Sequence, residues 1–177
     1  SMEKQTVFFE KMLERVNQSK DLSDTDMFNS LMYLGEFFTK ISALTLIASL
    51  SDDKHRTRES YLCQIVRASG IGDWSKVIDE ILVGPSVHLI PQYIQSITRE
   101  ITQNFQKGTW QYDSNFLIRE CLNEIKEEVE AQQIKVQGRN WFQLFAWLRN
   151  KTRGHGAEKS QTLSRVCPFL EESILLI

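Results

Sequence analysis

Residues 141–157 read Trp-Phe-Gln-Leu-Phe-Ala-Trp-Leu-Arg-Asn-Lys-Thr-Arg-Gly-His-Gly-Ala, an apolar pattern followed by a basic, glycine-containing segment. The apolar residues between Trp141 and Leu148 recur at intervals of three and four, which predicts an α-helix with a wide core-facing stripe. This pattern stops at Arg149, and a glycine lies on each side of His155. Because glycine favours the left-handed backbone of a helix C-terminal cap, we expect the helix to end there.

Arg149 and His155 are the candidate catalytic residues of this segment. Their spacing of six positions would leave them on different faces of a continuous helix, but a glycine turn can fold His155 back toward Arg149. A guanidinium is permanently charged and binds phosphate oxygens in a forked geometry, whereas an imidazole exchanges its proton near neutral pH. Together the two side chains suit chemistry at a phosphodiester.

Arg149-Asn150 followed by His155 resembles the Arg-polar-x(4–6)-His motif of the HEPN superfamily (higher eukaryotes and prokaryotes nucleotide-binding). Members are all-helical domains and include many metal-independent ribonucleases. The motif is matched closely, with five residues between Arg and His, and the helix-rich chain is matched loosely. HEPN toxins that are paired with nucleotidyltransferases carry a Tyr shortly after the His. Gly156-Ala157 stands there in this chain, which disfavours that subfamily.

The resemblance implies an endoribonuclease that needs neither a metal nor a cofactor, because the 2′-hydroxyl of single-stranded RNA attacks the neighbouring phosphorus. In that mechanism His155 moves the proton and Arg149 holds the phosphate. Asn150 would orient His155 or the phosphate, and Lys151 and Arg153 would contact the RNA backbone. The resemblance also implies a homodimer in which two motifs face one cleft. The aromatic helix from Trp141 to Leu148 is then a candidate interface.

Two alternatives remain open on the sequence. The chain could be a non-catalytic HEPN module that binds nucleotide, RNA or a partner domain within a larger sensor, kinase or defence protein. In the other alternative, Arg149 and Asn150 merely cap the helix and His155 fills a turn. An RNA-cleavage assay separates the enzyme from both.

Composition narrows the class of protein. A chain of 177 residues with 41% hydrophobic content fits one domain, 1–177, with its own core. The net charge of −2 means that nucleic acid would need a local basic patch, and residues 139–159 hold five basic residues against Glu158 alone. The three cysteines are far apart and indicate reduced, mostly buried thiols in a cytoplasmic protein. The histidines are too scattered to predict a metal site.

The N-terminus shows no signal peptide, and no apolar stretch is clean and long enough for a bilayer, which needs ~20 residues. We therefore expect no membrane partner. The chain ends on Leu-Leu-Ile177 without a polar tail. This end suggests the N-terminal part of a longer protein, with further domains C-terminal to it, although a docked terminal helix explains it nearly as well.

The remaining apolar patterns predict an all-α bundle of about six or seven helices. Helices are expected over 3–20, over a long central segment from Ser23 or Asp24 to Leu50, and over 61–70, 74–83, 93–107, 116–129 and 141–153. Gly72 or Asp73 is expected to begin the fourth of these. Residues 160–166 are expected to be irregular, with Pro168 in the first turn of a last helix.

Six further residues are assigned weaker roles. Glu36 and Lys40, four apart on the central helix, are expected to pair at the surface, or Glu36 to supply an acidic group near the catalytic cleft. His55 is expected to be exposed. His88 is expected to be partly buried with its hydrogen bonds satisfied. Trp110 and Tyr112 are expected in the core, with base stacking as the alternative.

Overall fold

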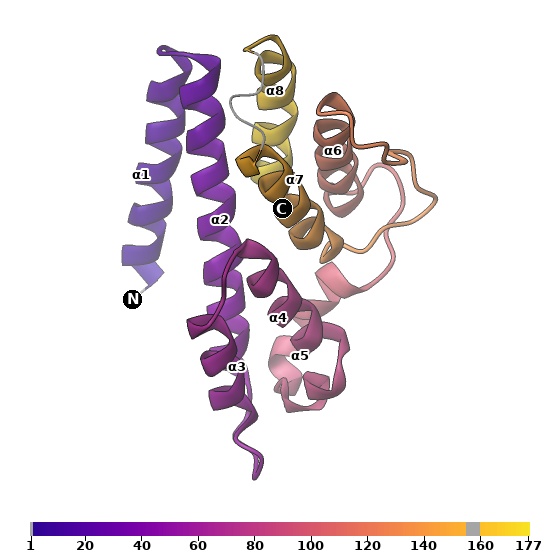
Figure 1. Cartoon of the computed structure of the whole chain (residues 1–177). Helices are drawn as coiled ribbons and strands as arrows, with labels where there is room; N and C mark the ends of the chain where they lie inside the picture. Colours follow the sequence, from indigo (N-terminus) through magenta and orange to yellow (C-terminus); the bar gives the residue numbers. More distant parts are fainter. Residues whose placement is uncertain (1, 155–159) are drawn as a thin grey trace.

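The computed structural model describes residues 2–154 and 160–177, and the side chains of residues 7–152 and 160–177. Eight α-helices and one 3-10 helix lie within these ranges, so the predicted all-α class is confirmed (Figure 1). Their bounds are α1 Met2–Lys20, α2 Asp24–Ser49, α3 Thr57–Val66, α4 Ile71–Val83, η1 Pro85–Leu89, α5 Gln92–Thr102, α6 Trp110–Glu124, α7 Asn140–Gly154 and α8 Ser160–Leu176.

Helix α2 is the axis of the bundle. It has 26 residues and is therefore about 39 Å long, and it contacts α1, α3, α4, α7 and α8 (Figure 1). The predicted Ser23 cap is confirmed, because the Ser23 hydroxyl accepts the Asp26 N–H at 3.0 Å. Among the described helices, α2 alone meets a test of length and apolarity for crossing a membrane. Its central position accounts for apolar residues on more than one of its faces.

The helices enclose two apolar clusters that share α2. The larger one surrounds Trp141 and Phe145 of α7, whose rings stack with centroids 5.1 Å apart. The smaller one lies at the other end of α2, between α2, α3, α4 and η1. In the larger cluster the Trp141 indole N–H donates to the Ser173 hydroxyl at 2.8 Å, and that hydroxyl donates to the Ser114 carbonyl at 2.7 Å. This relay joins α7, α8 and α6.

Four predicted helix starts are wrong. Helix α3 begins at Thr57 rather than at residue 61, and α6 begins at Trp110 rather than at residue 116. Helix α4 is capped by Gly70 rather than begun by Gly72 or Asp73. Asp73 lies in the first turn, where its carboxylate accepts hydrogen bonds from the N–H groups of Ser69 at 2.7 Å and Gly70 at 3.3 Å. These hydrogen bonds, those from Ser69 above all, lower the pKa of Asp73 below its ordinary value. The last helix begins at Ser160, not at Pro168, which lies inside α8. Buried Leu163, Val166 and Cys167 anchor the turns before the proline.

Helix α5 carries two largely exposed apolar residues, since Tyr93 and Ile97 are 76% and 69% exposed. Ile94 and Ile97 border an apolar hollow of about 500 Å³ beside α2. One prediction of burial is wrong. His88 is exposed, with its Nδ1 atom 2.6 Å from the Pro85 carbonyl oxygen. His55 is exposed and Tyr112 is buried, as predicted.

Candidate functional site

Helix α7 carries the candidate site and is anchored in the core by its apolar side chains. Its predicted apolar stripe is confirmed, since Trp141, Phe145 and Leu148 are fully buried within the chain. These three side chains lie in the core of one chain, so an interface on this helix would use its exposed residues. Trp147, 39% exposed, is the exception on this face, and its indole N–H donates to Glu127 at 3.2 Å.

Two ion pairs of the same kind hold the ends of α7. At its start the Arg139 guanidinium contacts the Asp79 carboxylate of α4, and at its end the Arg149 guanidinium contacts the Glu36 carboxylate of α2. All four side chains are between 19% and 29% exposed, so water screens these contacts only partly. Each pair joins α7 to a different neighbouring helix.

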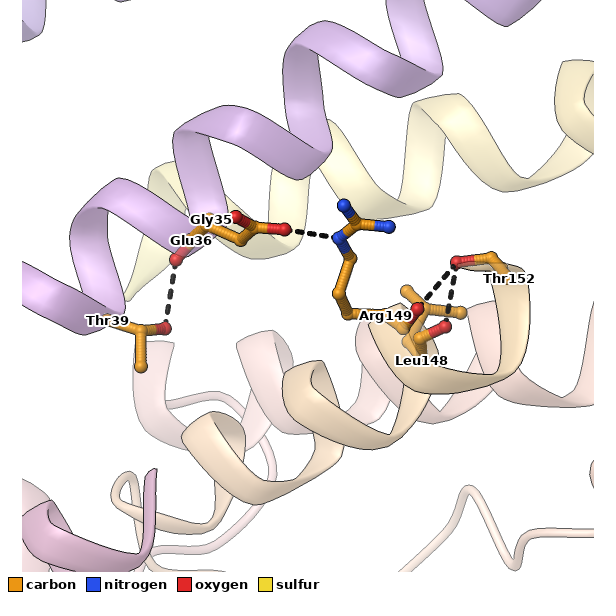
Figure 2. A network of polar contacts seen from close by, with 6 residues as sticks. All are labelled: Gly35, Glu36, Thr39, Leu148, Arg149 and Thr152. Carbon is orange, nitrogen blue, oxygen red and sulfur yellow. Dashed lines mark hydrogen bonds and ion pairs between the residues drawn. The ribbon is translucent and has the colours of Figure 1, made fainter. Parts of the chain in front are cut away.

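Gly35 determines how closely α2 approaches α7. A Cβ atom at this position would overlap ring carbons of Phe145, which lies one helical turn before Arg149. The missing side chain lets the two helices meet at the point where the next residue, Glu36, faces Arg149. The hydroxyl of Thr39, buried on the same stretch of α2, donates to the Gly35 carbonyl at 2.9 Å (Figure 2).

The Arg149 side chain is held by one of its three nitrogens. Figure 2 shows it pointing from α7 toward Glu36, with its Nε–H group donating to the carboxylate. Among the described residues, its two Nη nitrogens donate to no acceptor, and the side chain is 22% exposed. Two parallel N–H groups in this fixed plane match two oxygens of a phosphate. Glu36 thus orients Arg149 without occupying its forked end.

Glu36 does not pair with Lys40, the partner that the sequence predicted. Within the described residues Lys40 forms no ion pair, and its ammonium lies 5.8 Å from the centroid of the Trp74 ring. Glu36 pairs with Arg149 and so lies beside the candidate site. This position agrees with the alternative expectation, in which Glu36 supplies an acidic group there. Glu36 pairs with Arg149 of another helix rather than with Lys40, four residues along its own helix. The Arg149 guanidinium is half-buried and makes a charge-assisted hydrogen bond to the carboxylate.

The other predicted site residues separate onto two sides of α7. Asn150 is exposed and lies near the start of α4, where a Cβ on Gly72 would be 3.8 Å from its Nδ2 atom. Lys151 lies elsewhere, with its ammonium 3.1 Å from Glu127. The side chain of Arg153 and the whole of His155 lie outside the described residues. The structure therefore neither brings His155 to Arg149 nor separates them.

Arg149 and Asn150 border a polar hollow of about 400 Å³ between α2, α4 and α7. It is lined by Tyr33, Glu36, Lys40, Ala68, Ser69, Gly70, Ile71, Trp74, Arg149 and Asn150. Sequence reasoning missed the contributions of Tyr33, Trp74 and the start of α4. The motif residues Arg149 and Asn150 and the spacing of Glu36 and Lys40 on α2 pointed to this surface.

Comparison of the chain with protein-family models, with curated proteins and with solved structures finds no match. The resemblance to the HEPN superfamily is a prediction from the Arg149-Asn150 and His155 motif of the sequence. In the part of the chain that the structure describes, no group of three or more His, Cys, Asp or Glu side chains is arranged to hold a metal ion.

Proposed function

We propose that this protein is a metal-independent endoribonuclease that cleaves single-stranded RNA through Arg149 and His155. The 2′-hydroxyl attacks the adjacent phosphorus, so that the 2′-oxygen–phosphorus bond forms and the bond to the 5′-oxygen breaks. His155 takes the 2′-hydroxyl proton or gives a proton to the departing 5′-oxygen. The products are a 2′,3′-cyclic phosphate and a 5′-hydroxyl.

The observation that carries this proposal is the orientation of Arg149. A carboxylate holds its Nε–H, the two Nη groups are left for a ligand, and a polar hollow adjoins them. Charge that grows on the phosphate oxygens during attack would be stabilised by these donors without further rearrangement. Of the five basic residues between 139 and 159, Arg139, Arg149 and Lys151 pair with Asp79, Glu36 and Glu127, so these three add little net charge for attracting a polyanion.

The remaining parts of the proposal follow from the motif. Asn150 orients His155 or the phosphate, and Arg153 and Lys151 contact backbone phosphates beyond the reacting one. To contact a phosphate, Lys151 must leave its ion pair with Glu127. The enzyme works as a homodimer in the cytoplasm, with two motifs at one cleft and no cofactor.

Cleavage of a single-stranded RNA oligonucleotide in the presence of EDTA tests the proposal. We expect wild-type protein to release fragments that end in a 2′,3′-cyclic phosphate and to leave the DNA oligonucleotide of the same sequence intact. His155→Ala is expected to lower the cleavage rate by roughly 10² to 10⁴. Arg149→Ala is expected to do the same, because it removes the donors to the phosphate.

Arg165→Ala is the matched control for Arg149→Ala. Arg165 also donates its Nε–H to a glutamate on another helix, Glu124 at 2.6 Å, but it is 57% exposed and lies away from the hollow. We expect this variant to cleave at the wild-type rate. RNA binding without cleavage by the wild type would instead identify a non-catalytic module. Equal cleavage by wild type and His155→Ala would exclude the assigned chemistry.

A further inference from the structure

Lys40 is a cation without a carboxylate partner at the rim of the polar hollow. Lys20, Lys76 and Lys151 pair with acids, for example Lys20 with Glu171 at 2.5 Å and Lys76 with Glu80 at 3.8 Å. Lys40 belongs to the larger group of described lysines that form no ion pair, and it is the one that lines this hollow. Its ammonium lies over the Trp74 ring, a position that aromatic electron density favours and that directs the charge toward the hollow.

The side chains that line the hollow carry one more positive than negative charge. Its lining carries Lys40 and Arg149 against Glu36, and the Glu36 charge is engaged by Arg149. The first turn of α4 adds no net positive charge, because the Asp73 carboxylate lies there and accepts the N–H groups of Ser69 and Gly70. The free charge on this wall is thus that of Lys40.

The size and the remaining lining fit a nucleotide of a single strand. A volume of about 400 Å³ admits a phosphate together with part of its nucleoside. Tyr33, 54% exposed, borders the hollow and offers an aromatic face. A cationic groove with aromatic side chains beside it is the common arrangement for binding single strands.

We propose that this hollow binds a second phosphate of the RNA, next to the one held by Arg149, and that Lys40 is its principal contact. The inference rests on the proposed function in taking RNA as the ligand. It adds a binding site in which Lys40 positions the strand and takes no part in proton transfer. Strand contacts on this wall come from α2 and α4, outside the motif.

Binding of a fully 2′-O-methylated RNA oligonucleotide tests the site without cleavage, because the attacking hydroxyl is absent. We expect Lys40→Ala to raise the Kd roughly three- to tenfold at low salt. The slope of log Kd against log salt concentration should fall by about 0.7, the contribution of one single-strand phosphate. Lys40→Arg should keep most of the affinity. Lys76→Ala removes an exposed lysine of α4 that does not line the hollow, and it should bind as the wild type does.

The outcomes separate this inference from the proposed function. If wild-type protein cleaves RNA while Lys40→Ala and Lys76→Ala bind with equal Kd and equal salt slope, the second phosphate site is excluded and the ribonuclease stands. If Lys40→Ala lowers the slope and Lys76→Ala does not, the site is supported. That result holds even where the wild type binds RNA without cleaving it, in which case only the proposed chemistry fails.

Discussion

Glu36 and Asp79 make the same kind of contact at opposite ends of α7, yet only Glu36 adjoins the hollow. We expect Glu36→Ala to lower the RNA cleavage rate roughly ten- to a hundredfold, because the Arg149 plane is no longer fixed against the phosphate. Glu36→Gln keeps an acceptor for the Nε–H group and should retain more activity. Steady-state cleavage of an RNA oligonucleotide measures both.

Asp79→Asn is the control for this prediction. It weakens an equally shielded guanidinium–carboxylate pair, so both Asp79→Asn and Glu36→Gln are expected to lower the free energy of unfolding, by about 1–3 kcal/mol. Only the Glu36 variants should lose activity under conditions where the protein stays folded. Equal losses of activity in Asp79→Asn and Glu36→Ala would mean that Glu36 acts through stability alone.

The three cysteines differ in their surroundings. Cys63 is exposed, whereas Cys121 and Cys167 are buried and unpaired with any disulfide partner in the described structure, so the expectation of mostly buried thiols is confirmed. Burial raises the pKa of Cys121, with a smaller contribution from Cys167 nearby. Burial also raises the pKa of Cys167 to about 12. Both thiols therefore stay protonated and unreactive in the folded protein.

A thiol-labelling assay at pH 8 should modify Cys63 in the native protein and all three cysteines after denaturation. The raised pKa values also affect stability at alkaline pH. The unfolded thiols release protons above an ordinary pKa near 9.0, whereas the folded ones keep them, so the free energy of unfolding should fall as pH rises from about 9 to 12. Rapid native labelling of all three cysteines would contradict their burial.

Helices α2 and α7 approach each other closely at Gly35. Gly35→Ala places a methyl group against the fully buried Phe145 ring, and we expect a loss of about 1–3 kcal/mol in the free energy of unfolding. The loss should be smaller in a Phe145→Leu background, which makes room for the methyl. Denaturant unfolding of the four proteins measures this coupling, and equal losses in both backgrounds would show that the ring is not the obstacle.

The helices could be predicted from the sequence wherever one apolar stripe meets one core. Residues 141–148 are the best case, because their spacing and their burial agree. Prediction failed where tertiary contacts override a local rule. Pro168 favours a helix start, but buried residues on both sides of it hold one continuous helix. Local spacing also does not show that Tyr93 and Ile97 of α5 stay largely exposed while other isoleucines of this helix pack against the apolar clusters.

The candidate site could be predicted in part. The sequence identifies Arg149 as the end of an anchored helix, and it points to Glu36 as an acidic group. It could not show that the two meet, because 113 residues separate them and the meeting depends on Gly35. The free charge of Lys40 was hidden for the same reason, since local spacing assigns it to Glu36.

For the whole molecule, the proposed homodimer has a measurable consequence. If two chains complete one cleft, the specific cleavage rate should fall on dilution below the dimer dissociation constant, in parallel with the fraction of dimer. Light scattering or mass photometry across the same concentrations gives that fraction. A constant specific rate across the dimer-to-monomer transition would show that one chain holds a complete site.

The Ser173 hydroxyl accepts a hydrogen bond from Trp141 and donates one to Ser114, and it thereby links α7, α8 and α6. Loss of this single oxygen leaves the buried Trp141 indole N–H without an acceptor, which costs about 1–3 kcal/mol, whereas the Ser114 carbonyl, inside α6, keeps its helical partner. Amide protons of α6, α7 and α8 should then exchange with solvent as one cooperative block.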